Sequence, residues 1–109
     1  MPTEILLIFC TCPNWASAEQ IANQLIDDGL AACVNITTPV TSIYLWQRKR
    51  ETAEEHLLLI KTVKQRYPEL ERAITALHPY ELPEIVAVPV AQGLQGYLHW
   101  VEQCTKEKN

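Results

Sequence analysis

The stretch that decides the fold is residues 30–63, LAACVNITTPVTSIYLWQRKRETAEEHLLLIKTV. Two β-rich apolar runs, at 31–46 and 53–63, flank a charged segment at 47–52. This pattern predicts one long β-hairpin whose tip is the charged segment. Pro39 has no N–H to donate to a strand ladder, so the first arm should bend or bulge there.

Side chains alternate between the two faces of a strand, so the pairing of the arms decides which residues share a face. Pairing about a tip at 47–52 places the following residues on one face: Val40, Ser42, Tyr44, Trp46, Glu54, His56, Leu58 and Ile60. A slip of one residue would exchange the faces. In either register both faces carry large apolar groups, whereas a sheet with one solvent-exposed face is polar on that face. The sequence therefore predicts a sheet with two apolar faces.

The residues before the hairpin predict a strand and then a helix. Residues 5–10, ILLIFC, form a continuous apolar run, which is typical of a strand buried on both faces. Apolar residues then recur at helical spacing, at Ala18, Ile21, Ala22 and Leu25. Asn14 or Ser17 can cap the start of this helix, and Gly29 suits the left-handed residue that ends it.

The residues after the hairpin predict a helix, a strand and a last helix. Pro68 suits the first turn of the first helix, which should end near His78 because Pro79 follows. Its apolar stripe consists of Leu70, Ala73, Ile74 and Leu77. Residues 85–88 form a further buried strand, closed by Pro89. The last helix is marked by Tyr97, Trp100, Val101 and Cys104.

The predicted order is therefore β-α-β-β-α-β with an extra C-terminal helix, in a single domain over residues 1–109. Right-handed crossovers put both crossover helices on one face of a four-stranded antiparallel sheet, which is the α+β, ferredoxin-like arrangement with an extended β-hairpin. The opposite face stays bare although it is apolar. Burying each Val, Leu or Tyr side chain gains about 1.5–3 kcal/mol, so further copies of the chain should cover that face.

Composition excludes several classes of function. The net charge is −4, from 13 acidic and 9 basic residues, which argues against nucleic-acid binding, and the basic run at 48–50 is expected to be a solvated tip. No apolar run suits a signal peptide or a membrane span, so we expect a cytoplasmic protein whose four cysteines are free thiols. No catalytic motif appears, and three glycines provide no phosphate loop, so we expect no enzyme.

Three blocks of sequence resemble one family. They are GLAACVNI at 29–36, SIYLW at 42–46 with the later Lys61-Thr62, and HPYELPEI at 78–85. Together they are similar to CutA, the divalent-cation tolerance proteins, across nearly the whole chain. The resemblance implies a homotrimer of ferredoxin-like protomers, similar in architecture to nitrogen-regulatory PII proteins. It also implies copper binding and a role in the response to metal ions.

Four residues are candidate metal ligands. Cys10 and Cys12 place two thiols about 7 Å apart on one face of a strand end, and thiolates favour soft ions such as Cu(I) and Zn. Buried cysteine is also a common core residue, which is the interpretation we prefer for Cys10. The resemblance puts the family's copper-associated cysteine and histidine at Cys33 and His78. The alternatives are a buried thiol and a helix-ending histidine bonded to backbone. Cys33, His78 and Cys10 form the predicted metal set.

A second group of side chains predicts a small-ligand cleft. It consists of Tyr44, Trp46, Lys61, Tyr80 and Glu84, together with His78. Aromatic walls with a few charged groups often line such clefts, and the resemblance supports a ligand site here. The alternative is a polar belt between subunits, where Trp and Tyr are enriched.

The sequence thus predicts a cytoplasmic, trimeric, copper-binding protein of divalent-cation tolerance without catalytic turnover. The alternative is a PII-like signalling scaffold that binds a small anionic ligand through Lys61 and His78. An enzyme that uses His78 and Glu84 as an acid–base pair would lack any accompanying nucleophile or cofactor motif. The sequence assigns no role to Cys12 or Cys104.

Overall fold

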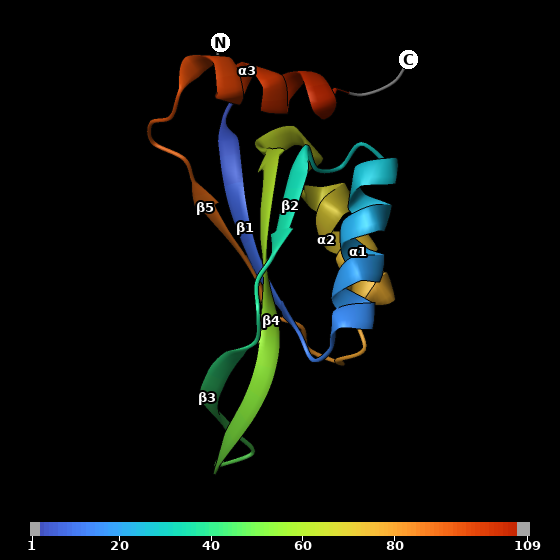
Figure 1. The fold of residues 1–109 in the computed structure, drawn as a ribbon, viewed down its shortest axis with the longest axis vertical. Helices are drawn as coiled ribbons and strands as arrows, with labels where there is room; N and C mark the ends of the chain where they lie inside the picture. Colours follow the sequence, from blue (N-terminus) through green and yellow to red (C-terminus); the bar gives the residue numbers. More distant parts are fainter. Residues whose placement is uncertain (1–2, 107–109) are drawn as a thin grey trace.

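The computed structural model describes residues 3–106 (Figure 1). The elements are β1 (Ile5–Cys12), α1 (Trp15–Asp27), β2 (Cys33–Ile36), β3 (Val40–Trp46), β4 (Lys49–Val63), a 3-10 turn (Lys64–Arg66), α2 (Tyr67–Leu77), β5 (Ile85–Pro89) and α3 (Gln95–Cys104). The sheet order is β2-β4-β1-β5, every neighbouring pair is antiparallel, and β3 extends the sheet by pairing with β4. The predicted α+β, ferredoxin-like class with a terminal helix is confirmed.

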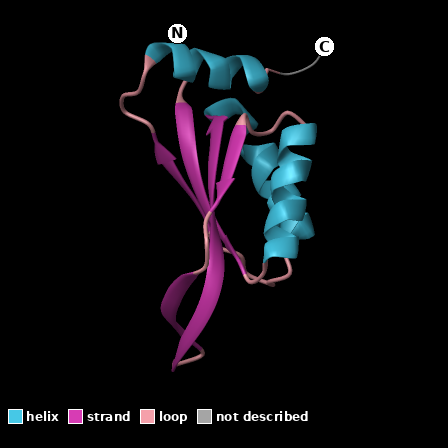
Figure 2. Ribbon diagram, viewed as in Figure 1, coloured by secondary structure: helices cyan, strands magenta, loops and turns pink. Residues whose placement is uncertain are grey.

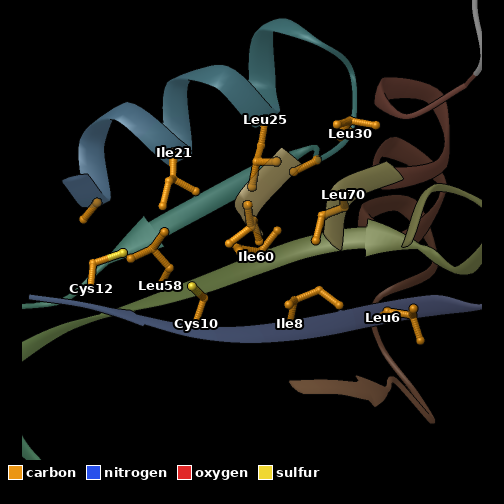
Figure 3. Packing of buried hydrophobic residues seen from close by; sticks show 13 residues of the cluster. Leu6, Ile8, Cys10, Cys12, Ile21, Leu25, Leu30, Leu58, Ile60 and Leu70 are labelled. Carbon is orange, nitrogen blue, oxygen red and sulfur yellow. The ribbon is translucent and has the colours of Figure 1, made fainter. Parts of the chain in front are cut away.

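Both crossover helices, α1 and α2, lie on the same side of the sheet (Figure 2). Alternate residues of the strands face these helices, since Ile8 pairs with Ile60 and Cys10 with Leu58. These four side chains are fully buried in one cluster with Ile21, Leu25, Leu70 and Ile74 of the helices (Figure 3). The core therefore occupies one face of the sheet only.

The ends of the helices follow local sequence signals. The Asn14 side chain accepts a hydrogen bond from the Ser17 backbone N–H at 2.8 Å, so Asn14 is the cap of α1. Gly29 has a φ of +68°, the left-handed conformation expected after this helix. Pro68 lies in the first turn of α2, which ends at Leu77. α3 crosses the end of the sheet and packs Val101 against Ile5 and Val63. No helix within residues 3–106 has the length and apolar character to cross a membrane.

The hairpin differs from the prediction at its tip. As expected, the first arm is interrupted around Pro39, between the end of β2 at Ile36 and the start of β3 at Val40. The predicted six-residue tip is wrong, because β4 already begins at Lys49. The turn consists of Gln47 and Arg48, with φ angles of 51° and 69°. Two consecutive positive φ angles suit a tight two-residue hairpin turn, which usually carries Gly, Asn or Asp.

This turn also shifts the register of the hairpin. Tyr44 pairs with Glu51 and Val40 pairs with Glu55, so the faces are exchanged relative to the prediction. By strand alternation, Tyr44 lies on the same face as Leu57, and not on the face of Leu58. The aromatic side chains of β3 therefore belong to the side of the sheet that the helices do not cover.

The uncovered face is apolar, as predicted. Leu7, Phe9, Leu57 and Leu59 are partly buried there, and Val86 of β5 remains 49% exposed. The hairpin carries further exposed apolar groups, of which Leu45 is 75% exposed. The molecule measures 46 × 27 × 23 Å, and β3 with the first half of β4 extends beyond the rest of the sheet (Figure 1).

Candidate functional site

Two thiols and an imidazole meet where β1 ends. Cys10 and Cys12 are on β1, and His78 follows the last residue of α2. One ligand atom from each residue lies within 4.8 Å of the others, and all three residues are buried. We call Cys10, Cys12 and His78 the Cys–His cluster. Figure 3 shows both sulfur atoms among the aliphatic side chains of the core.

Both ring nitrogens of His78 are engaged by backbone groups. The Tyr80 backbone N–H donates to Nδ1 at 3.0 Å. The other nitrogen, Nε2, therefore carries the proton and donates to the Thr11 carbonyl oxygen at 2.7 Å. This is the arrangement of a helix-ending histidine bonded to backbone, and it ties the end of β1 to the loop after α2.

The two thiols of the cluster are not equivalent. The pKa of Cys10 is raised, chiefly because its thiol donates a hydrogen bond to Cys12 and also because it is buried. The pKa of Cys12 is lowered, chiefly because it receives that hydrogen bond. Cys12 therefore loses its proton first, and the resulting thiolate is stabilised by the Cys10 thiol.

Cys33 lies apart from the cluster. It pairs with Lys61 across β2 and β4, and its Sγ atom is 3.8 Å from the Lys61 Nζ atom. Lys61 also donates to the side chain of Asn35. The metal set predicted from sequence is thus divided: Cys10 and His78 are brought together with Cys12, while Cys33 has a lysine as its neighbour. Strand alternation gave the signal for pairing Cys10 with Cys12, and the resemblance named His78, but only the three-dimensional fold shows that these three residues meet.

A cavity of about 830 Å³ lies between the hairpin and the loop at 78–85. Four residues of the predicted ligand cleft line it, namely Tyr44, Trp46, Tyr80 and Glu84. Lys61 and His78 are not among the residues that line it. Sequence reasoning missed three other lining glutamates, Glu51, Glu55 and Glu81. The correct hairpin register would have placed Glu51 beside Tyr44. We call this cavity the hairpin pocket.

One wall of the hairpin pocket contains a buried carboxylate. Glu55 is only 5% exposed, and its Oε2 atom accepts a hydrogen bond from the Tyr80 hydroxyl at 2.9 Å. Burial, helped by this hydrogen bond, raises the pKa of Tyr80 to about 12. Tyr80 therefore stays protonated near neutral pH and donates to Glu55. The pair joins the loop after α2 to the middle of β4.

A family model described as CutA1 divalent ion tolerance protein matches residues 6–104. The chain belongs to the CutA1 family. The divalent-cation tolerance protein CutA of Thermus thermophilus is 46% identical over 102 residues, which cover 94% of this chain and 97% of that protein. Protein CutA of Mus musculus is 43% identical over 106 residues, which cover 97% of this chain. The chain spans only 60% of the length of that mouse relative.

Solved structures of CutA1 proteins have the same fold. The divalent cation tolerance protein of Thermus thermophilus superimposes with a TM-score of 0.92 at 43% identity, covering 94% of this chain and 99% of that one. The periplasmic CutA of Archaeoglobus fulgidus gives a TM-score of 0.90 at 35% identity, also covering 94% and 99%. The family predicted from the three sequence blocks is therefore confirmed.

Proposed function

We propose that this CutA1 protein is a homotrimer that binds copper in divalent-cation tolerance and performs no catalytic turnover. The observation that carries this proposal is the Cys–His cluster, which collects two sulfur atoms and one imidazole within 4.8 Å. Sulfur and imidazole ligands suit copper and zinc, whereas Mg²⁺ and Ca²⁺ prefer oxygen ligands. Membership of a divalent-ion tolerance family supports a metal as the cargo.

The donor set fits a soft ion best. Cys12, as the thiol with the lower pKa, provides a thiolate, and a metal would displace the proton that Cys10 holds. His78 can coordinate only if it gives up one of its two backbone hydrogen bonds. The thiols are therefore the principal ligands and favour Cu(I). His78 is the third ligand, and Cys33 stays a prediction that mutation can test.

The bare face of the sheet supports the trimer. Leu57, Leu59 and Val86 expose apolar surface that no element of residues 3–106 covers, and the hairpin projects where it can reach a neighbouring copy. Covering such a face gains roughly 25 cal/mol per Å² of apolar area removed from water. In a closed symmetric trimer, every copy buries the same apolar face.

We assign the protein to the cytoplasm on the state of its thiols. All four cysteines are free in the structure, and reducing compartments keep cysteines in this form. Mass measurement of freshly purified protein under denaturing, non-reducing conditions should give four free thiols. A stoichiometric internal disulfide would contradict this location.

Copper titration of matched variants tests the metal site. Cys10→Ser, Cys12→Ser and His78→Ala should each weaken Cu(I) binding about 10-fold or more, which corresponds to at least about 1.4 kcal/mol per ligand. The controls are Cys104→Ser and His99→Ala, because both residues are exposed and lie outside the cluster. Isothermal titration with a competing chelator gives the affinities. Binding should weaken as the pH falls, since protons compete for the same ligand atoms.

Cys33→Ser decides between the two predicted metal sets. If it matches the Cys104→Ser control, the site is the Cys–His cluster. A loss of copper affinity in Cys33→Ser with none in Cys12→Ser would move the site to the other face of the sheet. Copper binding that none of these variants changes would reject the metal function. An anionic ligand in the hairpin pocket has no support from the lining charges, which are all glutamates.

A further inference from the structure

A second imidazole lies beside the Cys–His cluster. His56 of β4 is the antiparallel partner of Cys12, and Leu58 is the partner of Cys10, so all four side chains lie on the helix side of the sheet. The Cβ atoms of two directly paired residues are about 4.5–5.5 Å apart. His56 pairs with β1 and not with β3, so it belongs to the main sheet and not to the projecting part of the hairpin. It therefore lies away from the face that we assign to the trimer.

Neighbouring groups fix the orientation of the His56 ring. Its Nδ1 atom is 2.8 Å from the Thr37 carbonyl oxygen, which can only accept, so Nδ1 carries a proton and donates it. Thr37 is itself fixed by Leu57, whose backbone N–H donates to the Thr37 hydroxyl and whose carbonyl accepts from the Thr37 N–H. The Trp15 ring meets the imidazole edge-on, with 5.6 Å between the ring centroids. The ring is thus oriented before any ligand binds.

The second ring nitrogen of His56, Nε2, makes no hydrogen bond to any group within residues 3–106. With the proton on Nδ1, the Nε2 atom of the neutral ring has a lone pair that can bind a metal. A backbone carbonyl bonded to the other nitrogen is a usual support of a metal-binding histidine. His78 differs, because both of its ring nitrogens are hydrogen-bonded. His56 can therefore bind an ion without breaking a hydrogen bond, whereas His78 must first release one.

The burial of the Cys–His cluster separates its sulfur atoms from solvent. Cys10 and Cys12 are 0% exposed and His78 is 7% exposed. His56, in contrast, is partly exposed, and Trp15 beside it is 49% exposed. His56 is not among the three residues whose ligand atoms gather within 4.8 Å, so it is not part of the cluster itself. An ion bound to His56 would lie between solvent and the Cys12 thiol.

We propose that His56 is the entry ligand through which copper reaches the Cys–His cluster. Cu(I) first binds the Nε2 atom of His56, then the sulfur of Cys12, and finally Cys10 and His78. Imidazole and thiolate both suit copper, so each step exchanges one suitable ligand for another. Each thiol that binds the ion releases its proton to water, and the ion stays Cu(I) throughout. This inference rests on the proposed function, because it describes how the same copper site is filled.

The rate of Cu(I) transfer from a coloured Cu(I) chelate to the full chain in its native assembly tests the proposal. His56→Asn keeps an N–H donor for the Thr37 carbonyl but has no nitrogen in place of Nε2. It should slow the transfer about 10-fold or more, as the loss of a metal-binding group does. It should leave the equilibrium affinity for Cu(I) unchanged, because His56 is outside the cluster. The matched control is His99→Asn, which replaces an exposed histidine of α3 and should change neither quantity.

Trp15 gives a second measurement, which needs no change at His56. An ion on His56 lies beside the Trp15 ring, so it should quench Trp15 fluorescence before the ultraviolet absorbance of the Cu(I)–thiolate bonds appears. Trp15→Phe provides the blank, since it removes this early signal.

Three results would overturn the entry role and leave the copper site intact. They are an unchanged transfer rate in folded His56→Asn, equal slowing in His99→Asn, and Trp15 quenching that develops only together with the thiolate absorbance. A wild-type protein that binds no Cu(I) at equilibrium would instead reject the proposed function, and the entry role with it.

Discussion

The two halves of β4 have similar strand geometry but different surroundings. In the half nearer its C-terminus, β4 lies between β1 and β2, and Leu58 and Ile60 are fully buried beneath the helices. In the half nearer its N-terminus, β4 has β3 as its only strand neighbour in the described chain, and Glu51 and Glu54 are exposed. One continuous strand thus belongs partly to the core of its own protomer and partly to a projecting arm (Figure 1). The half nearer the C-terminus, which we call the inner half, stabilises the fold. The half nearer the N-terminus, the outer half, is available to a ligand or a second copy.

The largest effect should come from the bare face of the inner half. The double variant Leu57→Asp/Leu59→Asp places two charges on apolar surface that we assign to the trimer interface. It should give aggregated or unfolded protein and no soluble trimer, because the charges would have to be buried without partners. Light scattering with circular dichroism measures the outcome.

Gln20→Asp is the control for this double variant, because Gln20 is exposed on α1 and should tolerate a charge. It should leave the trimer intact. A wild-type protein that remains a monodisperse monomer at micromolar concentration would contradict the interface, as would a soluble, trimeric double variant.

A smaller loss of stability is expected when Glu55, the buried carboxylate between the two halves of β4, loses its hydrogen-bond donor. Tyr80→Phe removes the hydroxyl that donates to Glu55 and leaves the ring in place. The free energy of unfolding should fall by about 1–3 kcal/mol, since the buried acceptor loses the hydroxyl donor while staying desolvated. Chemical denaturation at one fixed protein concentration measures this change. An unchanged free energy of unfolding would mean that water replaces the hydroxyl.

Tyr80→Phe should also change how the stability of the protein depends on pH in the alkaline range. Burial and the hydrogen bond to Glu55 raise the pKa of Tyr80 in the folded protein to about 12, from the ordinary tyrosine value of 10.0. Between these two values the unfolded chain loses the tyrosine proton while the folded protein keeps it, so stability falls as the pH rises. Wild type should therefore lose stability more steeply than Tyr80→Phe in this range. Parallel slopes for the two proteins would show that Tyr80 titrates normally.

The sequence predicted the inner half of β4 better than the outer half. Apolar periodicity, Asn14, Gly29 and Pro68 gave the order and ends of the elements, because these signals are local. The turn at Gln47 and Arg48 was missed because neither residue type signals a positive φ angle, and one wrong turn exchanged the faces of the hairpin. In the candidate sites, strand alternation put Cys10 and Cys12 on one face, whereas the approach of His78 to these thiols and the positions of Glu51 and Glu55 depend on register and topology.

The smallest change in the free energy of unfolding is expected for the hydrogen bond between Thr41 and Glu54, the residue before Glu55 on β4. Thr41 pairs with Glu54 across the hairpin, and its hydroxyl donates to the Glu54 Oε1 atom at 2.9 Å. The distance equals that of the Tyr80–Glu55 bond, but both Thr41 and Glu54 are exposed. Water can replace the lost hydroxyl, so Thr41→Val should change the free energy of unfolding by no more than about 0.5 kcal/mol.

Comparing Thr41→Val with Tyr80→Phe thus shows how burial affects the stability that a hydrogen bond contributes. The two bonds have the same length and their acceptors, Glu54 and Glu55, are neighbours on β4. Both variants delete one hydroxyl that donates to a carboxylate, and each substitute keeps nearly the shape of the original side chain. The comparison uses the same denaturation assay at the same protein concentration. If Thr41→Val destabilises as much as Tyr80→Phe, Glu54 must be buried in the assembled protein. The projecting half of β4 would then be covered on the face opposite the hairpin pocket as well, and the trimer would enclose the arm from both sides.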